Sequence, residues 1–381
     1  MKKLFVMTVA ALAGASSAQA VDMKAGDWTV SVGGIVNAYY TQVSCSGDAV
    51  GGLALGGKAL GCGGKSDRTT IGNGLLPSGL ITSVKSKQGE YDVAATIGIM
   101  TATASDSAVG NNSNVDVRQG FFSFGNAQMG TIKLGRDYGI FGSAAILNDM
   151  TLVGAGAPVR ATQSNRVTLG HIGAGYSYLG TYGQMAYSSP SANGVKLDVA
   201  LVSPVTNGPL GTGYDSGSTP QVQGQVSLAQ GGMKAWLGAK GQKFDGTTIA
   251  NRDFTMRGVE LGGSYNTGPF GVLANVQTGT GLGIVSDGDQ GDNKSTNYFV
   301  QGTYKATDKV KIGLNYGLSK NKDNTTGTGG LESNSNVTGG VYFAITPSIT
   351  LAAELGQTRS KGFAGTSARM NGASFGGILF F

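Results

Sequence analysis

The chain has 381 residues, of which 66 are glycine, and only 13% are charged, about half the quarter that is usual in soluble globular proteins. With 14 Tyr, 14 Phe and a formal net charge of +6, the composition excludes a disordered chain and does not fit the highly charged surface of an ordinary soluble enzyme. One histidine, His171, and two cysteines leave few groups for metal or acid–base chemistry. We therefore expect no enzymatic activity, no cofactor, no metal site and no nucleic-acid partner.

Residues 1–20 have the three parts of a secretory signal peptide. The basic pair Lys2-Lys3 precedes an apolar run at 4–14, and Ala18-Gln19-Ala20 is a small-x-small cleavage motif. A membrane-anchor helix, the alternative, needs about 20 apolar residues, more than this run supplies. Residues 21–381 are then the exported domain.

The two cysteines, Cys45 and Cys62, lie in a glycine-rich stretch at 44–65. Because export permits disulfides, we expect one bridge that pins a loop. A bridge over a loop of this size stabilises by roughly 3 kcal/mol in the chain-entropy model. Two free thiols in an exposed loop are the alternative.

Hydrophobic residues alternate with polar or small residues along most of the chain. Between 309 and 318, one face carries Val310, Ile312, Leu314, Tyr316 and Leu318, and the other carries Lys311, Gly313, Asn315 and Gly317. The same period of two recurs at 28–40, 91–99, 195–201 and 349–356. This period is that of a β-strand and not of a helix, so the sequence predicts an all-β fold.

Short turns and long polar loops separate the predicted strands in alternation. Turns such as 87–90 and 307–308 contrast with loops such as 203–219, 281–293 and 321–333. This asymmetry and an even strand count are typical of a closed transmembrane antiparallel β-barrel in an outer membrane. The sixteen predicted strands are 27–43, 75–87, 90–101, 115–125, 130–137, 174–189, 194–203, 220–230, 233–245, 255–267, 270–280, 295–306, 309–320, 335–346, 349–360 and 370–381.

The apolar faces of these strands are expected to meet lipid, and the polar faces to line a water-filled lumen, since sixteen strands leave room for a channel. A positive lumen concentrates anions, so we expect a mild anion preference. The predicted inward cations are Lys85, Lys133, Lys196, Lys234, Lys240, Lys305 and Lys311, against the anions Asp92, Asp198, Glu260 and Glu354.

Two motifs resemble those of the general Gram-negative porins, the trimeric sixteen-stranded channels of proteobacterial outer membranes. The C-terminal segment 375–381 ends on Phe381 and places Leu379 and Phe375 at even spacing before it. In that family, such an end resembles the signal read by the barrel-assembly machinery. The segment Leu134-Gly135-Arg136-Asp137-Tyr138-Gly139 is similar to the Gly-Arg-x-Tyr-Gly motif that precedes the third loop.

The resemblance implies a homotrimer in an outer membrane with lipopolysaccharide, passing small hydrophilic solutes and anions. It also implies that the long third loop, residues 137–173, folds into the pore and narrows it. On this basis the basic wall of the constriction is Arg136, Arg68, Lys133 and Lys85, and the third-loop side is Asp149, Arg160 and Arg166.

Strict alternation disagrees with the resemblance at one position. It places Arg136 on the same face as Ile132 and Leu134, and only a bulge at Gly135 would turn the side chain into the pore. For Arg160 and Arg166, a solvated loop tip or a structural salt bridge is an equal alternative.

Other functions remain as alternatives to a diffusion channel. They are a substrate-specific channel, an adhesion or structural barrel with a blocked lumen, and an outer-membrane enzyme, which the single histidine argues against. The acidic run 287–292 lacks the spacing of a calcium loop and is expected to be solvated, and His171 is expected to be structural.

Overall fold

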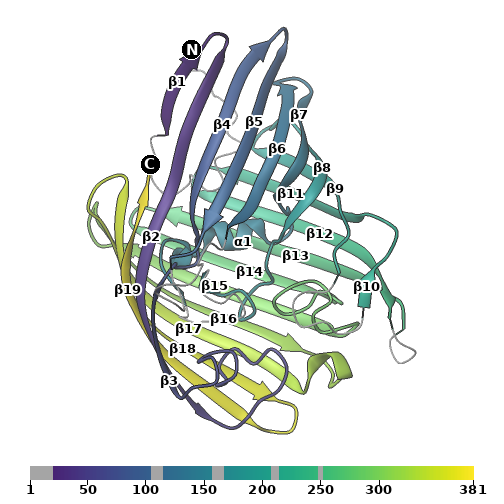
Figure 1. Cartoon of the computed structure of the whole chain (residues 1–381), viewed down its shortest axis with the longest axis vertical. Helices are drawn as coiled ribbons and strands as arrows, with labels where there is room; N and C mark the ends of the chain where they lie inside the picture. The colour runs from purple at the N-terminus through teal and green to yellow at the C-terminus, as the bar shows by residue number, and fades with distance from the viewer. Residues whose placement is uncertain (1–19, 104–114, 157–166, 207–213, 248–251) are drawn as a thin grey trace.

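The computed structural model describes residues 20–103, 115–156, 167–206, 214–247 and 252–381 (Figure 1). Its helical pieces are α1 (Ser143–Asn148), η1 (Met150–Val153) and η2 (Thr326–Thr328). The strands are β1 (Val21–Ala25), β2 (Trp28–Gly47), β3 (Asp67–Gly72), β4 (Ser78–Gln88), β5 (Tyr91–Thr101), β6 (Asp116–Asn126), β7 (Gly130–Tyr138), β8 (Thr181–Ser188), β9 (Val195–Val202), β10 (Tyr214–Ser216), β11 (Gln221–Gln230), β12 (Met233–Gly246), β13 (Phe254–Thr267), β14 (Phe270–Thr280), β15 (Lys294–Lys305), β16 (Val310–Asn321), β17 (Leu331–Ala344), β18 (Ile349–Gly362) and β19 (Ser367–Phe380).

These strands form one closed antiparallel barrel with sixteen strand positions, as the sequence predicts. The barrel closes where β2 pairs along its length with β19, from Ile35 opposite Phe380 to Gly47 opposite Ala368. On its other side β2 pairs first with β4 and then with β3, so these two short strands share one position. The short strands β1 and β10 likewise extend the positions of β19 and β11.

Burial alternates along the strands in the predicted sense. In β16, Leu314 is 60% exposed on the outer face, whereas Asn315 next to it is 2% exposed on the inner face. The outer face is therefore apolar, and the inner face is lined by polar groups. Within the described residues, no helix is long and apolar enough to cross a membrane.

One predicted strand was too long. The prediction began a strand at 174, whereas β8 begins at Thr181. Residues 167–180 instead fold into compact turns, with Gly173 and Gly180 at positive φ, a conformation that glycine adopts without strain. The third loop, defined here as residues 139–180 between β7 and β8, is therefore longer than expected.

The predicted disulfide is confirmed, with Cys45 and Cys62 bridged at an S–S distance of 1.97 Å. The first loop, residues 48–66 between β2 and β3, carries Cys62 and is not the exposed loop of the alternative prediction, because Leu55 and Cys62 are almost fully buried. Leu55 N donates to Asn334 Oδ1 at 3.1 Å, and Gly56 N donates to Ser360 Oγ at 2.8 Å. The first loop thus packs against inward side chains of β17 and β18.

Replacing both cysteines by serine is expected to loosen the first loop without opening the barrel. The bridge contributes about 3 kcal/mol in the chain-entropy model, but the bonds to Asn334 and Ser360 remain. We expect faster tryptic cleavage at Lys58 and Lys65, with the single-channel conductance unchanged. Equal cleavage rates in the wild type and the variant would contradict a constraining role for the bridge.

Candidate functional site: the third loop and the inner wall

The third loop is attached to the inner wall by two buried glutamates. Gly142 N, at the start of α1, donates to Glu260 Oε2 on β13 at 2.9 Å. Further along, Ala155 N and Gly156 N donate to Glu354 Oε2 on β18 at 2.9 and 2.8 Å. Both glutamates lie on the face predicted to be inward, so wall carboxylates bind loop backbone groups at two separated strands.

Between these two attachments, Asp149 links the loop to itself and to β16. It accepts from Thr151 N at 2.8 Å, from the Tyr176 hydroxyl at 2.6 Å and from Asn315 Nδ2 at 3.3 Å, and its Oδ2 lies 3.2 Å from His171 Nδ1. Asp149 is 4% exposed, so its carboxylate is enclosed by protein groups. Burial by itself would raise the pKa of Asp149, but the neighbouring His171, the Tyr176 hydroxyl and the Thr151 N–H together lower it below the usual range.

His171 has the structural role predicted for it. Its ring is fully buried between Asp149 and Phe299. The centroids of the His171 and Phe299 rings are 4.9 Å apart. Tyr176 packs edge-on against the same Phe299 at 5.3 Å. Through His171 and Tyr176, the third loop therefore packs against Phe299 of β15.

A second loop packs beside the third, namely residues 281–293 between β14 and β15. Asp287 forms a buried ion pair with Lys240 on β12, and Tyr178 N donates to Val285 O at 2.8 Å. Asp289 accepts three backbone N–H bonds from this loop, although burial raises its pKa to about 6. The prediction that residues 287–292 form a solvated loop was wrong, because these carboxylates have protein partners.

Arg136 faces away from this assembly. It pairs across the sheet with Gly120, on the face that carries Phe122 and Leu134, and its side chain is exposed. The register between β6 and β7 continues without a shift past Gly135, so the bulge that would turn Arg136 inward does not form. The assignment of Arg136 to the pore was therefore wrong, and the plain alternation was right.

A different arginine, Arg118 on β6, faces inward. The register between β5 and β6 shifts after Gly98, and this bulge puts Arg118 and Gln119 on the same buried side. Arg118 pairs with Asp116 at 2.9 Å and lies beside Tyr138 and Tyr178 of the third-loop region. Sequence alternation missed Arg118, since without a bulge its position belongs to the lipid face.

The two arginines give contrasting expectations for mutagenesis. Arg136→Ser removes an exposed outer-face cation, so conductance and reversal potential in a salt gradient should stay as in the wild type. Arg118→Gln removes a cation from the inner wall and should shift the reversal potential toward cations. The shift should shrink at high salt, because the Debye length falls from about 10 Å at 0.1 M to about 3 Å at 1 M. A shifted reversal potential in Arg136→Ser and an unchanged one in Arg118→Gln would instead place Arg136 in the pore, as the family resemblance implies.

The other predicted constriction residues do not gather around Asp149. Arg68 lies on the inner face opposite Val43, but its guanidinium lies against Gly63 of the first loop. Lys133 pairs with Asp137, and Lys85 lies near the short-turn end of β4. Arg160 and Arg166 fall outside the described residues.

Comparison with known proteins identifies the chain. The family model for Gram-negative porins matches residues 6–362. The chain belongs to the Gram-negative porins. It is thus an outer-membrane β-barrel of a channel-forming family. No curated protein sequence gives a significant match.

Solved porin structures share the fold at low sequence identity. The outer-membrane channel DcaP of Acinetobacter baumannii has a TM-score of 0.70 and 18% identity, covering 94% of this chain and 99% of that one. The anion-selective porin from Comamonas acidovorans has a TM-score of 0.65 and 16% identity, covering 93% and 100%. The trimer form of OmpT of Vibrio cholerae has a TM-score of 0.54 and 13% identity, covering 93% and 99%.

Four inward aromatic residues of this porin contact loops or other side chains of the inner wall. The Tyr39 hydroxyl donates to Val153 O at 2.7 Å, and Trp236 Nε1 donates to Asn275 Oδ1 at 3.0 Å. The Tyr342 hydroxyl donates to Glu354 Oε1 at 2.7 Å, and Phe299 packs against His171. All four aromatic side chains are buried, so none of them presents an exposed ring to the lumen.

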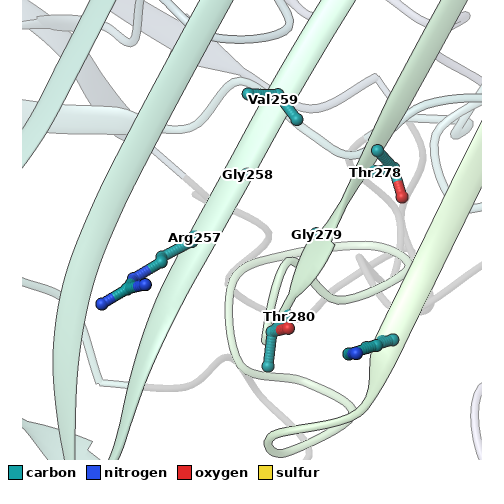
Figure 2. A pocket seen from close by; sticks show the side chains of 7 residues that line it. Arg257, Gly258, Val259, Thr278, Gly279 and Thr280 are labelled. Carbon is teal, nitrogen blue, oxygen red and sulfur yellow. The ribbon is translucent and has the colours of Figure 1, made fainter.

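A shallow pocket of about 310 Å³ lies on the outer surface of the porin, near the loop ends of β13, β14 and β15. Figure 2 shows its lining, in which Arg257 and Thr280 lie on neighbouring strands. Arg257 shares its face with the exposed Val259, and Lys294 lies opposite Thr280. The pocket is therefore on the outside of the barrel and separate from the lumen.

Proposed function

We propose that this porin is a passive diffusion channel for small hydrophilic solutes, with no catalytic step and a mild preference for anions. The observation that carries the proposal is the attachment of the third loop to inward groups on β13, β15 and β18, which supports a constriction inside a wide barrel. In this arrangement the loop narrows the lumen but leaves polar wall groups for water and solutes.

The balance of inward charge supports the anion preference. Lys133, Lys196 and Lys240 have carboxylate partners, whereas the buried Glu260 and Glu354 are used in binding loop backbone N–H groups. Lys85, Lys234, Lys305 and Lys311 have no carboxylate within 4.0 Å among the described residues, and they add uncompensated positive charge to the accessible wall. A wall of one sign attracts counter-ions, and this attraction weakens with salt.

Single-channel recording in planar bilayers tests this function. Ohmic current steps in KCl, and a zero-current potential of the sign for chloride preference in a KCl gradient, are the expected results. A silent protein would favour a blocked structural or adhesion barrel. Saturable block by one class of solute would favour a substrate-specific channel, and hydrolysis without current steps would favour an enzyme.

We propose a homotrimer, as in the trimer form of the structurally similar OmpT. The outer face of β4 to β6 is apolar up to its loop end, with Leu80, Ile97, Ile99 and Val117 exposed, and this patch supports a subunit contact. A native mass of one protomer in mild detergent would contradict the trimer.

The opposite flank of the barrel supports contact with lipopolysaccharide phosphates. Outer-face cations follow the loop ends of β13 to β19 above the apolar band, namely Arg257, Lys294, Arg359, Lys361 and Arg369. Arg359 lies directly opposite Arg369, an arrangement that an anion between them would stabilise. Long loops mark the extracellular end of such barrels, where the lipid phosphates lie.

Two processing steps complete the proposal. Residues 1–20 act as a signal peptide and are removed on export. The outward side chains of Phe375, Leu379 and Phe381 support recognition of this end by the barrel-assembly machinery. Replacing Phe381 by Ser should lower the amount of assembled barrel in the membrane, measured by heat-modifiable migration on gels.

A further inference from the structure

Lysines gather on the inner face at the short-turn end of the barrel, which is the periplasmic end in this architecture. Within the described part of the chain, no carboxylate lies within 4.0 Å of the ammonium groups of five of them. These five, here called the turn-end lysines, are Lys24, Lys85, Lys234, Lys305 and Lys311. Two come from the adjacent strands β15 and β16, two from β1 and β4 on either side of β2, and one from β12 (Figure 1).

Two of them face each other directly. Lys305, the last residue of β15, is the cross-strand partner of Lys311 on β16, and Lys311 Nζ lies 5.1 Å from the centre of the Tyr342 ring. Like charges directly opposite each other destabilise a sheet. The ring of Tyr342 accommodates one ammonium group, and Asp149 attracts Lys311 from a distance. Among the described residues, no carboxylate lies within 4.0 Å of either ammonium group.

A similar row occurs across the first strands. Thr29 on β2 pairs with Lys24 on one side and with Lys85 on the other, and Lys24 Nζ donates to Thr29 Oγ1 at 2.6 Å. The neighbouring inward lysines differ, since Lys133 and Lys196 each have an aspartate partner. The positive charge without a carboxylate partner is therefore concentrated at two places in this mouth, around Lys305 and Lys311 and around Lys24 and Lys85.

We propose that the turn-end lysines form an anion-binding site at the periplasmic mouth, with the Lys305–Lys311 pair as its strongest point. The ligands are small anions with two adjacent charges or oxygens, such as sulfate and dicarboxylates. The inference rests on the proposed channel function. It adds a second place at which anions are selected, besides the constriction at the third loop. The site concentrates anions on one side of the third loop, so anion flow through the channel depends on direction.

Sulfate is a suitable probe, because its charge is fixed near neutral pH. In planar bilayers with oriented insertion, sulfate added to the periplasmic side should reduce the chloride current more than sulfate added to the other side. In Lys305→Gln/Lys311→Gln, that side difference should largely disappear. From the Coulomb attraction between two lysines and a divalent anion in a watery mouth, the expected loss of sulfate affinity is roughly 3- to 10-fold at 0.1 M salt.

A matched control removes the same charge from the other end of the barrel. Lys320→Gln/Lys322→Gln changes two exposed lysines at the loop end of β16, and the side difference should remain as in the wild type. If the inner-face double variant conducts normally and keeps the wild-type side difference, the turn-end site is wrong and the channel function stands. If the wild type gives no current steps, the proposed function itself fails.

Discussion

Replacing Glu260 and Glu354 together by alanine is expected to increase the single-channel conductance and make it noisy. The two changes leave Gly142 N, Ala155 N and Gly156 N without their acceptors. A buried polar group that loses its partner costs about 1–3 kcal/mol, so the combined loss is large enough to let the third loop leave the wall. The barrel should remain, because its strand ladder does not depend on these side chains.

The matched control for that variant is Glu332→Ala/Asp308→Ala, which removes two acids that do not bind the third loop. Its conductance should equal that of the wild type. Glu354→Gln keeps one acceptor oxygen and should give an intermediate effect. An unchanged conductance in the Glu260/Glu354 double variant, with a heat-modifiable barrel still formed, would show that the third loop is held by other contacts.

Replacing Asp149 by alanine is expected to have the second largest effect on the channel, because it loosens the middle of the third loop. The change leaves Thr151 N, the Tyr176 hydroxyl and Asn315 Nδ2 without an acceptor, and leaves His171 buried beside a cavity. We expect proteolytic cleavage within residues 139–180 and fluctuating current steps. Protection from proteolysis equal to that of the wild type would contradict the role of Asp149.

The same carboxylate sets a pH dependence with a defined sign. Because the pKa of Asp149 is lowered in the folded protein, its stabilisation is fully present above the ordinary aspartate pKa. It is lost only as the pH falls through the lowered value. In the wild type, the contacts of Asp149 with Thr151, Tyr176 and Asn315 should therefore persist at a pH where ordinary aspartates protonate, and be lost below that range. Current noise recorded during stepwise acidification checks this expectation.

The sequence by itself determined the barrel wall of this protein. A period of two needs no distant information, since successive side chains on a strand must point to opposite faces. It placed Lys305, Lys311, Glu260 and Glu354 on the inner face, and for Arg136 it was more accurate than the family motif. The disulfide followed from two cysteines in one short segment of an exported chain.

The interior of the barrel was decided by the tertiary structure alone. The bulge beside Gly98 depends on how β5 and β6 align, and one extra residue is enough to turn Arg118 from lipid to lumen. The partners of Asp149 include Asn315, and those of Gly142 include Glu260, at separations of 166 and 118 residues. Contacts between such distant residues leave no periodic pattern in the sequence. They form because a buried N–H group or carboxylate must find a partner once the barrel has closed around the loops.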